Sequence, residues 1–328
     1  MVKRKSISVV RLFKYTKAFL KLIRIQNLMI VGATMYILRW FVVNPLLDYS
    51  GFESQISNPL YFLFVLATMC IAGAGYVIND YFDRKTDLIN KPGKVILGRI
   101  LSRRAGMFWH IALNTVGISL GVFISYRLGV LKYSVVFILI SGLLWFYSTT
   151  YKRQVLLGNL MVAVMVAAVP LLILLYEVPL VIENYKFLLN SNSHLLKQLI
   201  GWINGYAFFA FLLTFIREIV KDIEDFEGDF AFGRQTIPIA WGAQTAKWII
   251  YGLSGIALIT VVAALAFVLN DAISIVYGIV LVVSPLVLFC YLIVKADTKT
   301  DYSRASLLLK VIMLAGLCYV LVAYFFVY

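Results

Sequence analysis

Apolar stretches recur along the whole sequence, and short polar loops separate them. An α-helix needs about 20 residues to cross the hydrocarbon core of a bilayer. Nine stretches have about this length, and we expect each to form one helix with approximately these bounds: Ile25–Leu47, Leu60–Tyr81, Ala105–Tyr126, Leu131–Ser148, Leu156–Tyr176, Leu199–Phe215, Trp248–Leu269, Ala272–Val294 and Ser306–Tyr328. Because backbone groups in lipid must hydrogen-bond internally, and the stretches are too long for barrel strands, the pattern predicts an all-α, polytopic helix bundle.

The composition agrees with a membrane protein. Hydrophobic residues make up 62% of the 328 residues and charged residues 14%, whereas soluble domains average about 25% charged residues. We therefore expect a single transmembrane domain over residues 1–328. The cysteines Cys70, Cys290 and Cys318 lie in apolar stretches without the spacing of a metal site, so we expect no disulfide.

The basic residues are distributed unevenly. Residues 1–24 lack the apolar core and cleavage site of a signal peptide, and we expect them to form a basic, interfacial amphipathic helix. The loops after the even-numbered stretches are rich in Lys and Arg, whereas the opposite loops hold only Arg127, Lys186 and Lys197. The positive-inside rule thus predicts a multi-pass protein of the plasma (inner) membrane, with the N-terminus and the even-numbered loops in the cytoplasm and the C-terminus outside. This topology explains the net charge of +14, so we expect membrane lipid and no nucleic acid as a partner.

Two aspartate-rich motifs have the same i, i+3, i+7 spacing. The first triplet is Asp80, Asp83 and Asp87 at the end of the second stretch, and the second is Asp222, Asp225 and Asp229 after the sixth. At about 100° per residue, each triplet falls within an arc of about 60° on one helical face. Glu218 shares the arc of the second triplet.

Carboxylates clustered on one helical face repel each other, so a cation is expected to offset them. Mg²⁺ suits this role, because it prefers oxygen ligands and is commonly shared between carboxylates and substrate phosphates. A single triplet is also compatible with a solvated face that has no function. Two matched triplets at the ends of membrane helices favour a functional site that binds Mg²⁺ and a diphosphate.

Side chains that can donate to phosphate oxygens follow both motifs. They are Arg84, Lys91, Lys94 and Arg99 after the first motif, and Arg234 and Thr236 after the second. The membrane topology alone accounts for most cations in these loops. Arg84, Lys91 and Arg234 are preferred as ligands because they follow the acidic faces most closely. Lys152, near Tyr147 at the end of the fourth stretch, is a further candidate.

The motifs resemble those of a known family, the UbiA superfamily of intramembrane prenyltransferases. Its first motif, Asn-Asp-x-x-Asp-x-x-x-Asp, is matched in full from Asn79 to Asp87. The second motif, Lys-Asp-Ile-Glu-Asp-Phe-Glu-Gly-Asp followed by Gly-Arg-Gln-Thr-Ile-Pro, looks most like that of the digeranylgeranylglyceryl phosphate synthases. The resemblance spans most of the chain, but the loop stretch Asn90–Leu97 departs from the usual pattern, since it lacks an acidic residue and two prolines.

The resemblance implies transfer of a prenyl group, for these synthases a geranylgeranyl group, from a prenyl diphosphate to a lipophilic acceptor. It implies that Asn79 and the aspartates of both motifs surround Mg²⁺ and the diphosphate, while Asn27, Tyr147, Lys152 and Asn159 line the cavity. Within this set, we expect Asp80, Asp83, Asp222 and Lys152 to act in catalysis. For these synthases the acceptor is geranylgeranylglyceryl phosphate.

Other functions remain compatible with parts of the pattern. The acceptor is alternatively the ring carbon of 4-hydroxybenzoate or dihydroxynaphthoate in quinone biosynthesis, because both reactions suit the same ionisation of the donor. A cation transporter would also carry acidic residues in membrane helices, but they should lie near the midplane. A CDP-alcohol phosphotransferase is disfavoured because its Asp-Gly-x-x-Ala-Arg motif is missing.

Overall fold

The computed structural model describes residues 2–189 and 193–327. Within these ranges the chain forms helices and no β-strand, which confirms the all-α prediction. Met1 and Tyr328, where the predicted domain and its last apolar stretch reach the chain ends, lie outside the described residues.

The helices in these ranges have the following bounds. They are α1 (Val2–Leu22), α2 (Ile25–Leu38), the π-helix η1 (Arg39–Val43), α3 (Asn44–Tyr49), α4 (Asn58–Asn90), α5 (Arg103–Arg127), the 3₁₀ turn η2 (Leu131–Ser134), α6 (Val135–Thr149), the 3₁₀ turn η3 (Tyr151–Arg153), α7 (Leu157–Leu189), α8 (Ser193–Glu224), α9 (Phe226–Ala231), α10 (Ile237–Trp241), α11 (Ala243–Phe267), α12 (Ala272–Gly278), the π-helix η4 (Ile279–Val283), α13 (Ser284–Lys295), α14 (Lys299–Val322) and the π-helix η5 (Ala323–Val327).

The predicted number of membrane-spanning helices is confirmed. In the described part of the chain, nine helical spans are long and apolar enough to cross a membrane. Each contains most or all of one predicted stretch, and some run further into the loops: the second span continues to Asn90 and so includes the whole first motif. The polar ends of the helices are therefore longer than hydropathy alone indicates.

The chain divides into two compact units. Unit one comprises Met1–Ala33 and Ile56–Tyr151, and unit two comprises Thr34–Gln55 and Lys152–Tyr328. The first aspartate motif belongs to unit one and the second to unit two. The prediction of a single domain over residues 1–328 stays a prediction.

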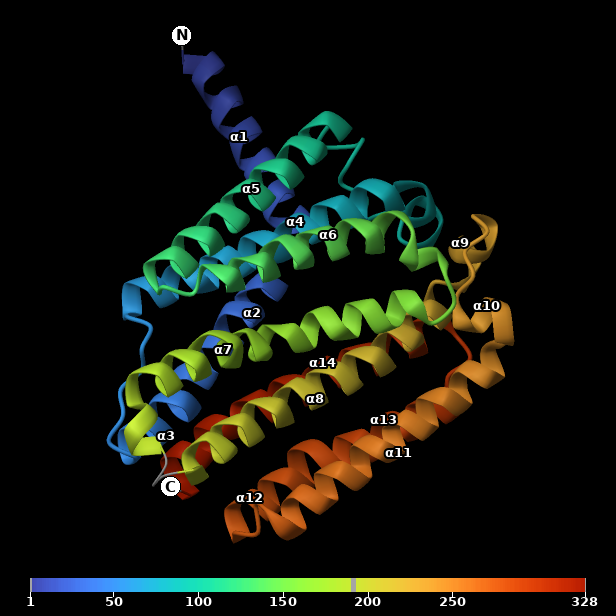
Figure 1. The fold of residues 1–328 in the computed structure, drawn as a ribbon. Helices are drawn as coiled ribbons and strands as arrows, with labels where there is room; N and C mark the ends of the chain where they lie inside the picture. The colour runs from blue at the N-terminus through green and yellow to red at the C-terminus, as the bar shows by residue number, and fades with distance from the viewer. Residues whose placement is uncertain (1, 190–192, 328) are drawn as a thin grey trace. The chain divides into compact units, whose positions relative to one another are not determined.

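In unit one, α4 packs along α5 and α6 (Figure 1). Glycines on α5 allow a close approach: a Cβ at Gly117 would lie 3.0 Å from the backbone oxygen of Ala67, and one at Gly121 would lie 2.4 Å from the ring of Phe137. Gly117 and Gly121 have the four-residue spacing by which small residues let membrane helices pack backbone to backbone. This contact fixes the helix that carries the first motif.

The N-terminal segment is helical, as predicted, and α1 ends just before Arg24, which has a positive φ of 51°. Ala18 and Leu22 are buried in an apolar cluster with Val77 of α4 and with Leu97 of the loop after α4. The end of α1 is therefore held against the helix of the first motif. Its predicted location at the membrane interface stays a prediction.

In unit two, α8 packs against α7, α11 and α14, and α13 packs against α11 and α14 (Figure 1). The apolar core between α8 and its neighbours includes Ile219, Val220, Ile250 and Leu309, all fully buried. These contacts position the C-terminal end of α8, where the second motif begins.

Unit two also contains charged groups that are buried in apolar surroundings. Glu177 of α7 is only 2% exposed, and it accepts a hydrogen bond of 2.6 Å from the backbone N–H of Gln55. Arg39, 3% exposed, lies close enough to interact electrostatically with this carboxylate. Glu177 therefore holds the loop before α4 and offsets the charge of Arg39.

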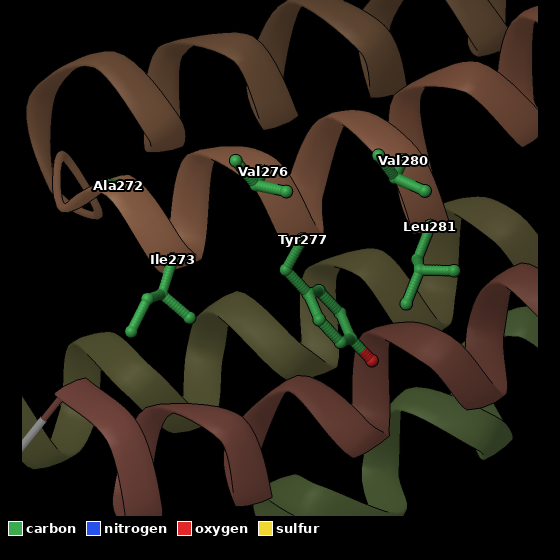
Figure 2. A pocket seen from close by; sticks show the side chains of 6 residues that line it. All are labelled: Ala272, Ile273, Val276, Tyr277, Val280 and Leu281. Atoms are coloured by element: carbon green, nitrogen blue, oxygen red, sulfur yellow. The ribbon is translucent and has the colours of Figure 1, made fainter.

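An open, apolar hollow lies on the surface of α12 and η4. Figure 2 shows the side chains that line it: Ala272, Ile273, Val276, Tyr277, Val280 and Leu281. Tyr277 is the polar residue among them, and its hydroxyl donates to the carbonyl oxygen of Ala315 at 2.7 Å. The hollow contains none of the predicted site residues, and its composition is that of a lipid-facing surface.

The glycine contact on α5 predicts a specific loss of stability. Gly117→Val is expected to lower the free energy of unfolding by about 1–3 kcal/mol, because the added methyl groups must displace Ile71 or the Ala67 backbone. Gly142→Val on α6 is the matched control, since a Cβ there meets no atom within 4 Å. Thermal and denaturant unfolding in detergent micelles measure both variants. Equal stability of the two would contradict the close α4–α5 contact.

The buried charges predict coupled mutational effects. Glu177→Leu is expected to destabilise unit two by about 3 kcal/mol or more, because it removes the carboxylate that offsets the buried charge of Arg39. Adding Arg39→Met should recover part of this loss, although the N–H of Gln55 still lacks its acceptor. Unfolding of the single and double variants in micelles gives the coupling energy. Strictly additive losses would show that Arg39 and Glu177 do not interact.

Candidate active site

The first motif lies on a single helix. Asn79, Asp80, Asp83 and Asp87 all belong to α4, which continues without interruption to Asn90. The three aspartates therefore share one helical face, as their spacing predicts. Asp83 is 4% exposed, whereas Asp80 and Asp87 on either side of it are partly exposed.

Arg24 pairs with this motif and was not among the predicted site residues. Its Nη2 donates to Asp80 Oδ1 at 2.9 Å, and the guanidinium carbon Cζ lies over the Tyr76 ring, 4.9 Å from the centroid. Burial alone would lower the pKa of Arg24, but Asp80 and Tyr76 raise it above its ordinary value. Arg24 therefore stays charged and offsets Asp80. The sequence shows Arg24 only as the end of a basic segment, because the turn between α1 and α2 that directs it inward has no sequence signature.

Two predicted cavity residues belong to unit one together with the first motif. Asn27 lies in the first turn of α2, and its backbone N–H donates to the Arg24 carbonyl at 2.8 Å. Tyr147 lies in the last turn of α6 and is partly exposed. The structure thus places Asn27 three residues after Arg24, which pairs with Asp80.

The loop after α4 is compact, and it contacts the predicted phosphate ligand Arg84. A Cβ at Gly98 would lie 2.6 Å from Arg84 Nε, so a larger residue would clash with that side chain. Gly98 also has a φ of +82°, a backbone conformation that favours glycine. Lys91 ends α4, and its N–H donates to the Asp87 carbonyl at 2.8 Å. Leu97, in the stretch that departs from the family pattern, is buried against the end of α1. Apolar packing therefore shapes a loop in which the family usually has prolines.

The second motif differs from its prediction. We expected Asp222, Asp225 and Asp229 on one face of a single helix, but α8 ends at Glu224 and the short helix α9 begins at Phe226. Asp225 lies between them with φ −99° and ψ 12°, and Asp229 lies on α9. Continuing the helix would align three carboxylates on one face, whereas the break places Asp225 and Asp229 at the N-terminal end of a new helix, where negative charge is favourable.

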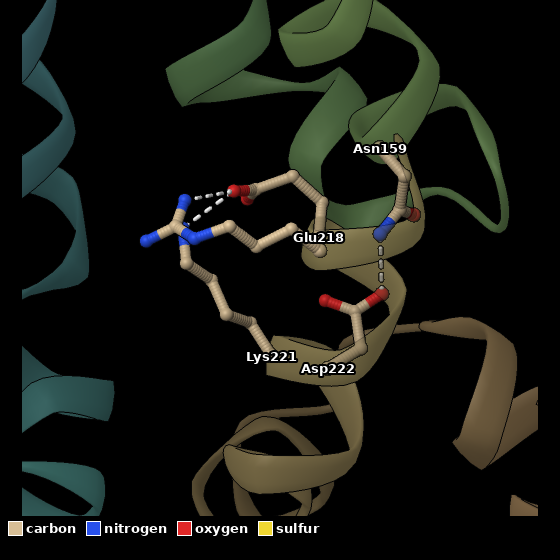
Figure 3. A network of polar contacts seen from close by, with 5 residues as sticks. Asn159, Glu218, Lys221 and Asp222 are labelled. Carbon is tan, nitrogen blue, oxygen red and sulfur yellow. Dashed lines mark hydrogen bonds and ion pairs between the residues drawn. The ribbon is translucent and has the colours of Figure 1, made fainter. Parts of the chain in front are cut away.

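Asp222 is held by a side chain from α7. The amide Nδ2 of Asn159 donates to Asp222 Oδ2 at 2.7 Å, and Figure 3 shows the two side chains directed toward each other. Lys152 of η3 interacts electrostatically with Asp222 and with Glu218. Three predicted site residues, Lys152, Asn159 and Asp222, are therefore brought together within unit two.

Glu218 lies one turn before Asp222, and basic side chains rather than an amide offset its charge. Its Oε1 accepts from Lys221 Nζ at 2.5 Å; both residues are labelled in Figure 3. The same oxygen accepts from Arg217 Nη1 at 3.4 Å. The spacing of the carboxylates points to Glu218, but it does not reveal that Arg217 and Lys221 lie beside it, since basic residues near a helix end are expected from topology alone.

Asp229 forms an ion pair with Arg234. Arg234 Nη1 lies 3.1 Å from Asp229 Oδ1, both side chains are largely buried, and the Arg234 N–H donates to the Asp229 carbonyl at 3.0 Å. The backbone N–H of Gln235 donates to the Arg153 carbonyl at 3.1 Å, which attaches this loop to η3. Arg234, predicted to bind phosphate, thus pairs with the second motif in this structure.

The arrangement leaves each motif able to share a metal ion with a substrate. Among the described residues, no three side chains of His, Cys, Asp or Glu lie close enough together to hold a metal ion. Mg²⁺ bound through one or two carboxylates and substrate phosphates does not need such a cage. The carboxylates and the adjacent cations therefore suit a phosphate-bearing substrate that brings part of the coordination with it.

The sequence matches the profile of the UbiA prenyltransferase family over residues 49–326. Digeranylgeranylglyceryl phosphate synthase from Thermococcus kodakarensis is 31% identical over 299 residues, which is 90% of this chain and 93% of that protein. The synthase of the same name from Sulfolobus acidocaldarius is 31% identical over 297 residues, again 90% and 93% of the two chains.

Solved structures have the same fold. A structure of digeranylgeranylglyceryl phosphate synthase aligns with a TM-score of 0.59 and 24% identity over 94% of this chain and 97% of that one. A UbiA homologue from Archaeoglobus fulgidus, bound to GPP and Mg²⁺, aligns with a TM-score of 0.55 and 15% identity over 92% of this chain and 99% of that one. With its nine apolar spans, the chain is an integral, multi-pass membrane protein that belongs to the UbiA prenyltransferase family.

Proposed function

We propose that this prenyltransferase transfers a geranylgeranyl group from geranylgeranyl diphosphate to geranylgeranylglyceryl phosphate. The observation that carries the proposal is the arrangement of both aspartate motifs, in which Asp80, Asp222 and Asp229 each lie beside a cation or an amide donor. The choice of acceptor is supported by the synthases of this name that match over 90% of the chain.

The reaction is a substitution at the allylic carbon of the donor. The bond between this carbon and the diphosphate oxygen breaks, and the bonding electrons leave with the diphosphate. An ether bond forms to the acceptor hydroxyl, which loses its proton, so no oxidant or reductant is needed. The negative charge that grows on the leaving group is where stabilisation by the protein lowers the barrier most.

We propose Asp80, Asp83, Asp87, Asp222, Asp225 and Asp229 as the ligands of Mg²⁺. The residues fit this ion, because they supply carboxylate oxygens in pairs and leave coordination positions for phosphate oxygens. When bound, Mg²⁺ would neutralise the charge that develops on the leaving diphosphate. Asn159 would hold Asp222 in one orientation through the 2.7 Å hydrogen bond.

The basic residues are proposed to bind the diphosphate directly. Lys152 is proposed to act in catalysis, because it interacts electrostatically with Asp222 and Glu218. Arg84, Lys91 and Arg234 are proposed as further phosphate ligands, and Arg234 would then exchange its contact with Asp229 for one with the substrate. The polar side chains Asn27, Asn79 and Tyr147 are proposed to line the substrate cavity.

The dry, apolar interior of the bundle would protect the reacting carbon from water, since an allylic carbon that loses diphosphate reacts rapidly with any nucleophile. The proposed topology has the N-terminus and the loops of both motifs in the cytoplasm of a cell with a plasma (inner) membrane. This follows from the excess of basic residues in these loops. The water-soluble diphosphate head would then enter and leave on the cytoplasmic side.

The proposal predicts a Mg²⁺-dependent activity with one preferred acceptor. Purified protein in micelles, labelled geranylgeranyl diphosphate and geranylgeranylglyceryl phosphate should give the doubly prenylated ether lipid, and chelation of Mg²⁺ should abolish product formation. 4-Hydroxybenzoate and dihydroxynaphthoate are offered in parallel assays. Product from an aromatic acid alone would assign the enzyme to quinone biosynthesis and refute the proposed acceptor.

The aspartate motifs predict large kinetic losses. Asp80→Ala, Asp83→Ala and Asp222→Ala should each lower kcat by about 100-fold or more, because each removes a carboxylate proposed to stabilise the leaving group. Asp48→Ala, an exposed aspartate of α3 outside both motifs, is the control and should keep full activity.

A second control separates chemistry from structure at Asp80. Arg24→Gln breaks the same ion pair but keeps the carboxylate, so it should lose less activity than Asp80→Ala. Thermal unfolding of every variant tests whether the fold is kept. Wild-type turnover in all three alanine variants would rule out the proposed metal ligands.

A further inference from the structure

Three basic side chains of unit two gather inside membrane-spanning helices. Arg217 and Lys221 lie one turn apart on α8, and both contact Oε1 of Glu218, at 3.4 Å and 2.5 Å. Arg217 lies inside its span, seven residues before the end at Glu224 and just after the apolar stretch that ends at Phe215. Cations at such positions usually face the interior of a bundle and mark a substrate or ion pathway.

Lys310 of α14 adds a third positive charge. The two helices pack through Ile216 and Val220 on α8 and Leu309 on α14, which belong to one buried cluster. Lys310 directly follows Leu309 and lies close enough to Arg217 for the two positive charges to repel each other. It is eleven residues inside the span that begins at Lys299.

These contacts leave Arg217 incompletely satisfied. The Nε atom of Arg217 is buried and has no hydrogen-bond acceptor in the part of the chain that the structure describes. A buried donor without an acceptor costs free energy, and the approach of Arg217 and Lys310 adds electrostatic repulsion in a medium of low dielectric constant. Both costs would be removed by an anion with several oxygen atoms placed against the two helices.

We propose that Arg217 and Lys310, with Lys221, bind the phosphate group of the acceptor lipid. This inference rests on the proposed function, since it assigns the acceptor's head group to residues that lie outside both aspartate motifs. Arg217 offers a planar set of donors that matches phosphate geometry, and Lys310 offers a point charge. A phosphate monoester carries a charge of about −1.5 to −2 at neutral pH, which suits a cluster with several cations and one bonded carboxylate.

The position along α8 favours the acceptor over the donor as the source of the phosphate. Arg217 precedes Asp222 by five residues, which places it about 7 Å further along the helix axis. In a glyceryl phosphate with a free hydroxyl on the neighbouring carbon, the phosphate and the attacking oxygen are separated by a few bonds. A phosphate set back from Asp222 by this distance leaves the hydroxyl near the proposed diphosphate site.

The test compares two acceptors that differ only in the phosphate, geranylgeranylglyceryl phosphate and geranylgeranylglycerol. Arg217→Gln and Lys310→Gln should each lower kcat/KM for the phosphorylated acceptor by about 10- to 100-fold, the cost of one charge-assisted hydrogen bond. The kcat/KM for the alcohol and the KM for geranylgeranyl diphosphate should not change. Arg217→Lys keeps the positive charge and should retain part of the preference for the phosphorylated acceptor over the alcohol. Arg304→Gln, which removes an exposed cation of α14, is the matched control.

The outcomes separate this inference from the proposed function. Formation of product from geranylgeranylglyceryl phosphate with an unchanged acceptor preference in both Gln variants would overturn the phosphate site and leave the proposed function intact. Equal losses for both acceptors, or a raised KM for the donor, would assign the cations to folding or to the diphosphate and also overturn it. If the wild type makes no product from this acceptor, the proposed function fails. Thermal stabilisation by geranylgeranylglyceryl phosphate, present in the wild type and lost in the variants, then decides the phosphate site alone.

Discussion

Compensation of charge inside an apolar bundle is the constraint on which the rest of this structure depends. Carboxylates at the ends of membrane helices are costly unless a cation or a hydrogen-bond donor lies beside them. Asp80 is offset by Arg24, Asp222 by Asn159, and Asp229 by Arg234, each at 3.1 Å or less. The apolar contacts that fix α4 and α8 matter because they hold these pairs at the helix ends.

The fold followed from the sequence because its main signal, the length of the apolar stretches, is local. The same holds for the first motif, since α4 continues through Asp87 as a regular helix. The second motif was harder: helical spacing predicts one face, but the repulsion among its carboxylates and the preference of acidic residues for a helix N-terminus favour a break at Asp225. The periodicity of the sequence contains no information on either of these two electrostatic effects, so it does not predict the break.

The pairings within the site were the part that the sequence could not supply. Arg24 and Arg217 look like ordinary topogenic cations, because the positive-inside rule accounts for any basic residue near a cytoplasmic helix end. Their roles depend on partners 56 residues away, for Arg24 and Asp80, or on a neighbouring helix, for Arg217 and Lys310. Glu177 and Arg39 were missed for the same reason. Each is a single charge in an apolar stretch, and the sequence does not show that the two side chains lie close enough to offset each other.

The degree of compensation differs among these groups, and the difference has a physical consequence. Arg39 and Glu177 are both deeply buried, and Glu177 also accepts a backbone hydrogen bond, so this contact suits a permanent structural role. The pair of Arg24 with Asp80 is more exposed, and a strong ligand can compete for either partner at a lower cost in desolvation. At Arg217, the buried Nε donor has no acceptor in the described part of the chain, and the positive charge of Lys310 lies close by. The bundle thus compensates its structural charges but leaves a donor at Arg217 without an acceptor among the described residues. An anionic substrate that supplies this acceptor would gain binding free energy.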